Sequence, residues 1–348
     1  MPVRFDRSLD DRFLAHLKTN LAWLVSAPRR QPIQWALDPQ FRERAGRGGA
    51  TQRPGNTFAL YYGTTELLHA KWSSGDVGDF VSFSARGSHL ASDAAGLLGR
   101  HALGTAAGLE TKAQRYLSSA MAAGENRYFT PDREGYWQNF LAWWFGSQWN
   151  PQKELLVVDR ETVLGFDSAD EKDAWYGEIT RSYERLAERI RASRTDKFQK
   201  PANFGDELDL LAIDRQGRLI CMELKHRDYS SGVYWAPLQV SAYRDAYAKA
   251  SAALHAGIAK VVRQKIELGL LPTGAEHVLP KRPWTGEEIC PVVAIAQPSK
   301  ESSGWDAWKA LRIVQLALAQ PVPVMLVDAQ SDGIEASWHQ EWPLPSPA

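Results

Sequence analysis

The stretch 205–225 constrains the fold more than any other part of this chain. Two apolar runs, 208–213 and 219–224, flank a short polar segment that contains Gly217. This pattern predicts a β-hairpin with a loop of about four residues. Both runs place apolar residues on both faces of the expected strands, so we expect the hairpin to lie inside a sheet and not at an exposed edge.

Three charged residues interrupt these apolar strands. Asp209 lies near the start of the first strand, and Glu223 and Lys225 share one face of the second. Burial of an unpaired carboxylate is costly, so such charges are expected to have a partner, and a cation is the obvious one. Carboxylate oxygens favour hard cations, which predicts Mg²⁺, with Mn²⁺ as the alternative.

This combination of charges suits the hydrolysis of phosphodiester bonds. A Mg²⁺ ion held by two carboxylates supplies Lewis acidity and lowers the pKa of a bound water. A lysine one pleat period from the glutamate can align or deprotonate an attacking water, and can stabilise the charge that develops on phosphorus. The three residues therefore predict a metal-dependent phosphodiesterase.

The spacing of these residues resembles that of a known superfamily of nucleases. Asp209, followed by Glu223 and Lys225 on a hairpin between two helices, resembles the PD-(D/E)xK superfamily, which has the restriction-endonuclease-like fold. Gln239 and Tyr243, on the next expected helix, resemble the Gln-x-x-x-Tyr motif of its RecB-type branch.

The resemblance implies a fold and a set of roles. The core would be a helix, three strands, a second helix and a fourth strand, with a metal site at one end of the sheet. Asp209 and Glu223 would be the metal ligands, and Lys225 would be the catalytic lysine. Gln239 would orient the lysine or a phosphate, and Tyr243 would support the site.

The likeness extends over residues 171–253, and members of the superfamily often take a further glutamate from the helix before the hairpin. That helix is expected here over 170–194 and carries Glu178 and Glu184. Glu178 is favoured as a ligand and catalytic residue, because Glu184 belongs to a ladder of alternating charges that is typical of a solvated helix face. Four residues near the motif are candidate contacts to nucleic acid: Lys197, Lys200, His226 and Arg227.

The rest of the chain predicts two domains, divided near residue 150. Residues 1–150 are rich in aromatic side chains and carry an Arg/Gly loop at 42–56, and we expect an α+β domain for recognition or partner binding. In residues 151–348, expected helices and strands predict an α/β fold with a mixed central sheet flanked by helices. A hairpin turning at residues 159–161 is expected within 154–166.

Composition narrows the possible classes of protein. The formal net charge is zero, so a nucleic-acid partner would need a local basic patch. The only two cysteines, Cys221 and Cys290, lie in apolar runs without metal-ligand spacing, which argues against zinc, an iron–sulfur cluster and a disulfide framework. No run of residues is apolar for long enough to predict a membrane span, and we expect a cytoplasmic protein.

Several alternatives stay open at this point. In one alternative, Asp209 ends its strand in solvent, and Glu223 and Lys225 form an ion pair at a sheet edge. A catalytically silent nuclease fold could serve as a scaffold subunit of a nucleic-acid-processing or defence assembly. A glycosidase fits less well, because glycosidases rely on two opposed carboxyl groups and a lysine two residues from Glu223 suits that chemistry poorly. The sequence does not separate DNA from RNA, although DNA is favoured, or endonuclease from exonuclease.

Overall fold

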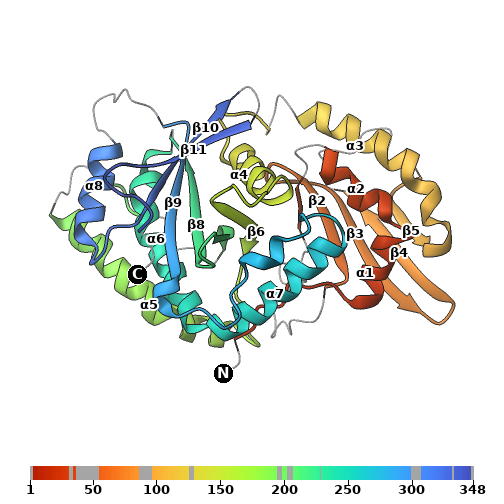
Figure 1. Cartoon of the computed structure of the whole chain (residues 1–348), viewed down its shortest axis with the longest axis horizontal. Coiled ribbons are helices and arrows are strands. Elements are labelled where there is room, and N and C mark those ends of the chain that lie inside the picture. Colours follow the sequence, from red (N-terminus) through yellow and green to blue (C-terminus); the bar gives the residue numbers. More distant parts are fainter. Residues whose placement is uncertain are drawn as a thin grey trace. The chain divides into compact units, whose positions relative to one another are not determined.

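The computed structural model describes residues 3–30, 34–36, 55–85, 96–124, 129–193, 198–201, 207–227, 229–298, 307–330 and 333–345. These residues form a mixed α/β structure with two sheets (Figure 1). The chain divides into two compact units. Unit 1 contains Met1–Arg4, Pro151–His255 and Val278–Ala348, and unit 2 contains Phe5–Asn150 and Ala256–His277.

Unit 1 is built on a six-stranded mixed sheet with the order β11-β10-β9-β8-β7-β6. Neighbours β6, β7 and β8 are antiparallel, β8, β9 and β10 are parallel, and β11 runs antiparallel to β10. The apolar strands β7 and β8 are therefore interior to the sheet. The strands are β6 (Leu155–Thr162), β7 (Leu208–Asp214), β8 (Leu219–His226), β9 (Ile289–Ala296), β10 (Val324–Gln330) and β11 (Gly333–Trp338).

Helices of unit 1 group beside β8 and β9 (Figure 1). Helix α6 packs on both strands and also contacts α5 and α8. The start of α5 is fixed by Ser168, whose hydroxyl accepts a hydrogen bond from the backbone N–H of Glu171 at 3.1 Å. The helical elements are α5 (Ala169–Ala192), α6 (Ser230–Lys249), the first residues of α7 (Ser251–Glu267), η6 (Gly286–Glu288) and α8 (Ala307–Ala317).

The hairpin expected within 205–225 is confirmed. Four residues join β7 to β8, and Gly217 adopts a positive φ of 79°, which a residue without a Cβ tolerates. Its N–H donates to the carbonyl of Asp214 at 3.0 Å. Nearly every residue of both strands is buried, as their place inside the sheet requires.

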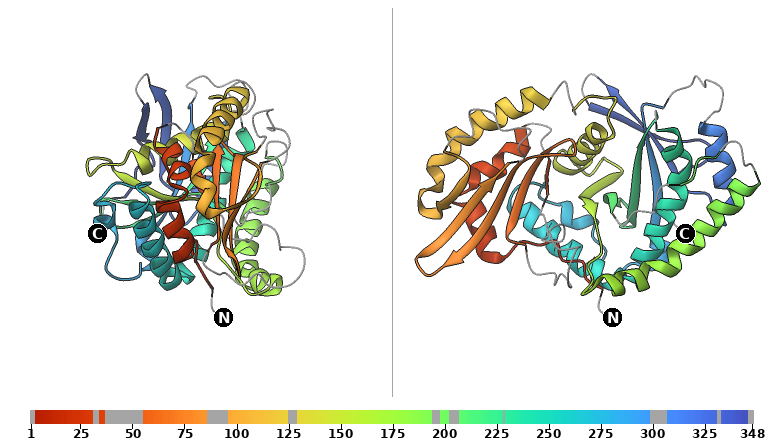
Figure 2. Two further views of the ribbon diagram at one scale, coloured as in Figure 1. Left: turned by 90° about the vertical axis from the view of Figure 1, so that its right-hand side faces the viewer. Right: turned by 180° about the vertical axis from the view of Figure 1, so that it is seen from behind.

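Unit 2 is built on a five-stranded antiparallel sheet with the order β1-β2-β3-β4-β5, drawn in orange in the right-hand view of Figure 2. The turn Gly63–Thr64 joins β2 to β3. Strands and helices of this unit are β1 (Gln34–Ala36), β2 (Thr57–Tyr62), β3 (Thr65–Gly75), β4 (Gly78–Ser84), β5 (Gly99–Ala102), α1 (Asp11–Lys18), α2 (Ala22–Arg30), η3 (Leu103–Leu109), α3 (Glu110–Gly124), α4 (Glu134–Ala142), the π-helical turn η4 (Trp143–Ser147), the remainder of α7 and η5 (Ala275–Val278), whose last residue is in unit 1.

The core of unit 2 recruits residues from far along the chain. Val261, Leu268 and Leu270 join the apolar cluster formed by α1, α2, α3 and the sheet. The side chain of Gln264 also bonds both backbone groups of Leu9, at 2.7 and 2.9 Å. Residues 256–277, which the sequence placed with the C-terminal part, therefore pack in the N-terminal unit.

Two features of unit 1 differ from expectation. The hairpin expected at 154–166 is wrong, because β6 continues from Leu155 to Thr162 with only a register shift between Val157 and Asp159. The resemblance implies three consecutive strands after the first helix, whereas α5 lies between β6 and the β7–β8 hairpin, so only two strands follow that helix directly. Residues 159–161, where a turn was expected, instead continue β6 and pair with β7.

Two other expectations concern loops and membrane spans. Residues 42–54 of the Arg/Gly loop lie outside the described residues, so the structure does not bear on its role. Among the helices that the structure describes, none combines the length and the apolar character needed to cross a membrane.

Candidate active site

The register of the central hairpin sets Asp209 opposite Glu223. Leu210 pairs with Met222. Because the strands are antiparallel, Asp209, one residue before Leu210, lies opposite Glu223, one residue after Met222. Antiparallel neighbours that face each other point their side chains to the same side of a sheet. Lys225 follows Glu223 by two residues, so it shares that side. The structure thus brings together the three residues that the sequence singled out.

Lys225 lies between the two carboxylates. Its Nζ is 2.7 Å from Oε1 of Glu223 and 3.7 Å from Oδ2 of Asp209. Glu223 is 1% exposed and Lys225 is 7% exposed, so this cluster is not a solvated ion pair at a sheet edge. Two carboxylates therefore lie within 4 Å of one ammonium in this cluster.

Asp209 experiences opposing influences. Burial raises the pKa of its carboxyl group above the ordinary 3.8, while Lys225 and the backbone N–H of Leu224 oppose that shift. That N–H donates to Oδ2 of Asp209 at 2.8 Å. The charge of Glu161, on the neighbouring strand β6, raises the pKa of Asp209 further.

Helix α6 supplies two residues to the same region, as the sequence predicted. The hydroxyl of Tyr243 donates to the carbonyl of Glu207 at 2.7 Å, and Gln239 hydrogen-bonds the same phenol. Burial first, and then the neighbouring charge of Glu223, raise the pKa of Tyr243 well above its ordinary value. Tyr243 therefore remains a neutral hydrogen-bond donor that fixes α6 to the residue two before Asp209.

Glu161 was missed as a site residue, because the sequence assigned it to a turn. In the ladder between β6 and β7, Arg160 pairs with Leu210 and Thr162 with Leu208, which sets Glu161 beside Asp209. Glu161 has a positive φ of 47°, which is uncommon outside glycine and concentrates at functional sites. Only the register of two strands that are distant in sequence could have revealed it.

Tyr247 was missed as well. It lies one helical turn after Tyr243, and its hydroxyl is 3.0 Å from both the hydroxyl and the carbonyl oxygen of Thr162. This contact holds the end of β6, next to Glu161, against α6. A second tyrosine at the i+4 position was the signal that could have indicated this role.

Glu178 lies away from this cluster. Its side chain is 84% exposed, and its Oε2 is 4.0 Å from Nζ of Lys249. Lys249 follows Tyr243 by six residues, or roughly 9 Å along α6. Glu178 is on the solvent-exposed face of α5, whereas the opposite face buries Tyr176, Ile179 and Ala187.

The four candidate contacts to nucleic acid fall in different environments. His226 ends β8, is 4% exposed, and has Nε2 3.3 Å from Oε1 of Gln297, so its ring is not presented to a ligand in solvent. Arg227 and Lys200 are exposed. Lys197 lies outside the described residues.

The donor set can be tested against the expected metal. Asp209, Glu223 and Glu161 offer carboxylate oxygens, which are the ligands that Mg²⁺ takes. Among the residues that the structure describes, no three His, Cys, Asp or Glu side chains already converge as a metal site. The ammonium of Lys225 instead places positive charge between two of the carboxylates. The donor types, three carboxylates, are those that suit a divalent cation such as Mg²⁺.

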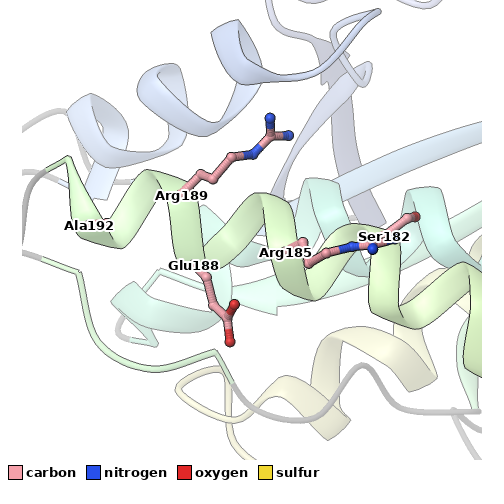
Figure 3. Close-up of a pocket in the computed structure, with 5 residues that line it drawn as sticks. All are labelled: Ser182, Arg185, Glu188, Arg189 and Ala192. Atoms are coloured by element: carbon pink, nitrogen blue, oxygen red, sulfur yellow. The ribbon is translucent and has the colours of Figure 1, made fainter.

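A second feature of unit 1 is a hollow of about 620 Å³ along the C-terminal half of α5 (Figure 3). Arg185 and Arg189 are exposed, and Glu188 points away from Arg189 in this view. Two arginines and one glutamate thus line the hollow, and none of the residues of the carboxylate–lysine cluster does. Its lining residues are Ser182, Arg185, Glu188, Arg189 and Ala192.

No protein-family model, curated protein or solved structure matches the chain. Any assignment of activity therefore depends on the geometry and chemistry of Asp209, Glu223 and Lys225 and on the residues that surround them.

Proposed function

We propose that this protein is a Mg²⁺-dependent nuclease of the PD-(D/E)xK type that hydrolyses phosphodiester bonds, in the first instance in DNA. The observation that carries the proposal is the buried cluster in which one lysine lies between two facing carboxylates. A structural ion pair has no need of a second carboxylate in the same buried place.

The order of elements around the cluster supports the proposal. Strands β7 and β8 form the hairpin, α6 follows with Gln239 and Tyr243, and the parallel strand β9 comes next. These elements occur in the order that the PD-(D/E)xK resemblance implies. Helix α5 precedes the hairpin, as the resemblance implies, but β6 comes before α5, so only two strands follow the helix directly. We assign Glu161, on β6, the part that the resemblance gives to a glutamate on the preceding helix.

Each residue then has a part in hydrolysis. Asp209, Glu223 and Glu161 would hold the cation, which when bound supplies Lewis acidity toward the scissile phosphate. Lys225 would position the attacking water and stabilise the negative charge that develops on phosphorus. The oxygen of that water would form a bond to phosphorus while the bond from phosphorus to the leaving sugar oxygen breaks, and the proton lost by the water would end on the leaving oxygen.

Isosteric replacement of Glu223 tests the proposal. Glu223→Gln removes one carboxylate charge without changing side-chain volume, and it leaves Lys225 paired with Asp209. We expect cleavage of circular single-stranded and linear double-stranded DNA in Mg²⁺, no cleavage in EDTA, and a loss of at least about 100-fold in the variant. Glu178→Gln, on the exposed face of α5, is the matched control and should cleave like the wild type.

Three other outcomes have defined meanings. Cleavage that persists in EDTA or in Glu223→Gln would refute the assignment. Mg²⁺ binding measured by calorimetry, without cleavage of DNA or RNA, would favour a catalytically silent scaffold. Cleavage of circular DNA would identify an endonuclease, because an exonuclease needs a free end.

A further inference from the structure

Tyr229 is an exposed aromatic residue immediately before α6. It is 51% exposed, and within the described part of the chain only Val77 and Leu316 are other large apolar side chains with such exposure. Its place in the backbone is fixed on both sides: its N–H donates to the carbonyl of His226 at 2.9 Å, and its carbonyl accepts from Val233 at 2.9 Å. A well-held backbone thus presents an aromatic ring to solvent.

The ring of Tyr229 lies beside Lys225. A Cβ built on Gly232 would be 2.1 Å from Cδ1 of Tyr229 and 3.0 Å from Cδ of Lys225. Both side chains therefore approach the same point, and the tyrosine ring occupies space that any residue larger than glycine would take. The absence of a side chain at Gly232 allows this arrangement in the first turn of α6.

We infer that the ring of Tyr229 stacks on a nucleobase of the substrate next to the scissile phosphate. This inference rests on the proposed nuclease function. In the proposed function, the charged residues of the cluster act on the scissile phosphate, but they offer no flat apolar surface to the base of the same nucleotide. Aromatic rings provide such a surface, and they accept every base because each has a π-face.

The inference also specifies the substrate class. Inside a duplex both faces of a base are covered by its neighbours, so an exposed ring can stack only on a nucleotide that is unstacked. Tyr229 therefore favours single-stranded DNA, or an unpaired end, over a blunt duplex. The ring and not its hydroxyl is the group that acts, so phenylalanine should replace tyrosine without loss.

Binding of oligonucleotides in EDTA tests this without any need for cleavage. Fluorescence anisotropy would be measured with a labelled single-stranded DNA of about 15 nucleotides and with the same sequence as a blunt duplex. Stacking by one aromatic residue predicts a Kd for the single strand that is about 5- to 100-fold weaker in Tyr229→Ala. Tyr229→Phe and the exposed control Leu316→Ala should stay within about twofold of the wild type.

A scan of abasic sites along the strand sharpens the result. One abasic position should weaken binding by the wild type and leave binding by Tyr229→Ala unchanged, which would locate the stacked base. Tyr229→Ala that binds like the wild type, while the wild type cleaves DNA in Mg²⁺, would refute the stacking and leave the nuclease function standing. A wild type that neither binds nor cleaves nucleic acid would overturn both.

Discussion

The two ends of the β7–β8 hairpin both bury charged side chains, but they balance those charges differently. At the turn, Asp214 is 1% exposed and bonds Arg218 through Nε at 2.6 Å. Its other oxygen accepts from the backbone N–H groups of Gln216 and Arg218, at 2.9 and 2.8 Å. Arg218 also donates to the carbonyl of Pro345 at 2.6 Å. One anion meets one cation, and their hydrogen bonds are made within the protein.

At the opposite end, Asp209 and Glu223 share the single ammonium of Lys225. Glu223 is as buried as Asp214, whereas the side chain of Asp209 is 20% exposed. The number of carboxylates around the cation distinguishes the two clusters, because a second acidic side chain placed beside a buried one is costly and persists where it has a use. The comparison suggests that the turn serves the fold and the strand end serves the chemistry.

The largest expected effect is on the rate of DNA cleavage and concerns Lys225, at the strand end of the hairpin. Lys225→Gln should reduce kcat for DNA cleavage by about 10²–10⁴-fold, since a positioned catalytic group contributes on that order. Lys249→Gln, an exposed lysine on α6, should leave kcat unchanged. Steady-state cleavage of a labelled oligonucleotide in Mg²⁺ measures both, and a reduction of less than tenfold in Lys225→Gln would remove the lysine from the mechanism.

The next effect concerns stability at the turn. Arg218→Met should lower the free energy of unfolding by about 3–5 kcal/mol, because it leaves the buried Asp214 without its guanidinium. Urea denaturation measures this change. Arg215→Met, an exposed neighbour in the same turn, should change it by less than about 1 kcal/mol. At a temperature where Arg218→Met remains folded, it should still cleave DNA. A loss of cleavage by the folded variant would show that the turn also contributes to catalysis.

A smaller effect identifies the third carboxylate. Glu161→Gln should weaken Mg²⁺ binding by about 10- to 100-fold, the range reported for residues that complete or support a metal site. Glu178→Gln should bind Mg²⁺ like the wild type. Isothermal titration calorimetry with Mg²⁺ on the two variants decides whether the third ligand is Glu161 on β6 or Glu178 on α5. Weakened Mg²⁺ binding in Glu178→Gln, with wild-type binding in Glu161→Gln, would assign the ligand to α5.

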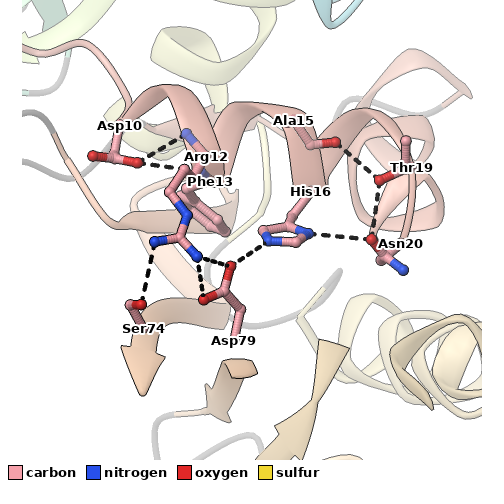
Figure 4. Close-up of polar contacts among 9 residues, drawn as sticks. All are labelled: Asp10, Arg12, Phe13, Ala15, His16, Thr19, Asn20, Ser74 and Asp79. Atoms are coloured by element: carbon pink, nitrogen blue, oxygen red, sulfur yellow. Dashed lines mark hydrogen bonds and ion pairs between the residues drawn. The ribbon is translucent and has the colours of Figure 1, made fainter. Parts of the chain in front are cut away.

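The smallest effect comes from an ion cluster in unit 2 that contrasts with both ends of the hairpin (Figure 4). Asp79 accepts from Arg12 at 2.9 and 3.0 Å and lies 2.8 Å from Nε2 of His16. The hydrogen bond from His16, followed by the charge of Arg12 and a hydrogen bond from Ser74, holds the pKa of Asp79 below the ordinary 3.8. Arg12 is 64% exposed, so water screens much of the interaction.

A pKa lowered by folding means that ionised Asp79 stabilises the native state above its unfolded pKa. That contribution disappears as pH falls through the folded pKa. Asp79→Asn should therefore cost about 1 kcal/mol at pH 7, and the difference from wild type should shrink below about pH 4. Thermal unfolding at several pH values measures it, with the exposed Asp76→Asn as control. A difference that does not vary with pH would exclude ionisation as the cause.

The sequence by itself determined the parts that depend on local pattern. Alternation within two short apolar runs predicted β7, β8 and their loop, and it placed Asp209, Glu223 and Lys225 as interruptions of buried strands. Helical spacing placed Gln239 and Tyr243 on one face of α6. These inferences needed only the period of a strand or a helix, which is fixed by backbone geometry within a few residues.

The tertiary structure decided what depends on partners far apart in the chain. The pairing of β6 with β7 brings Glu161 to Asp209, and the packing of α5 turns Glu178 toward solvent instead. Residues 256–277 join the core of unit 2, although they follow the site in sequence. Register and packing are set by apolar contacts between distant segments, and no local period encodes them.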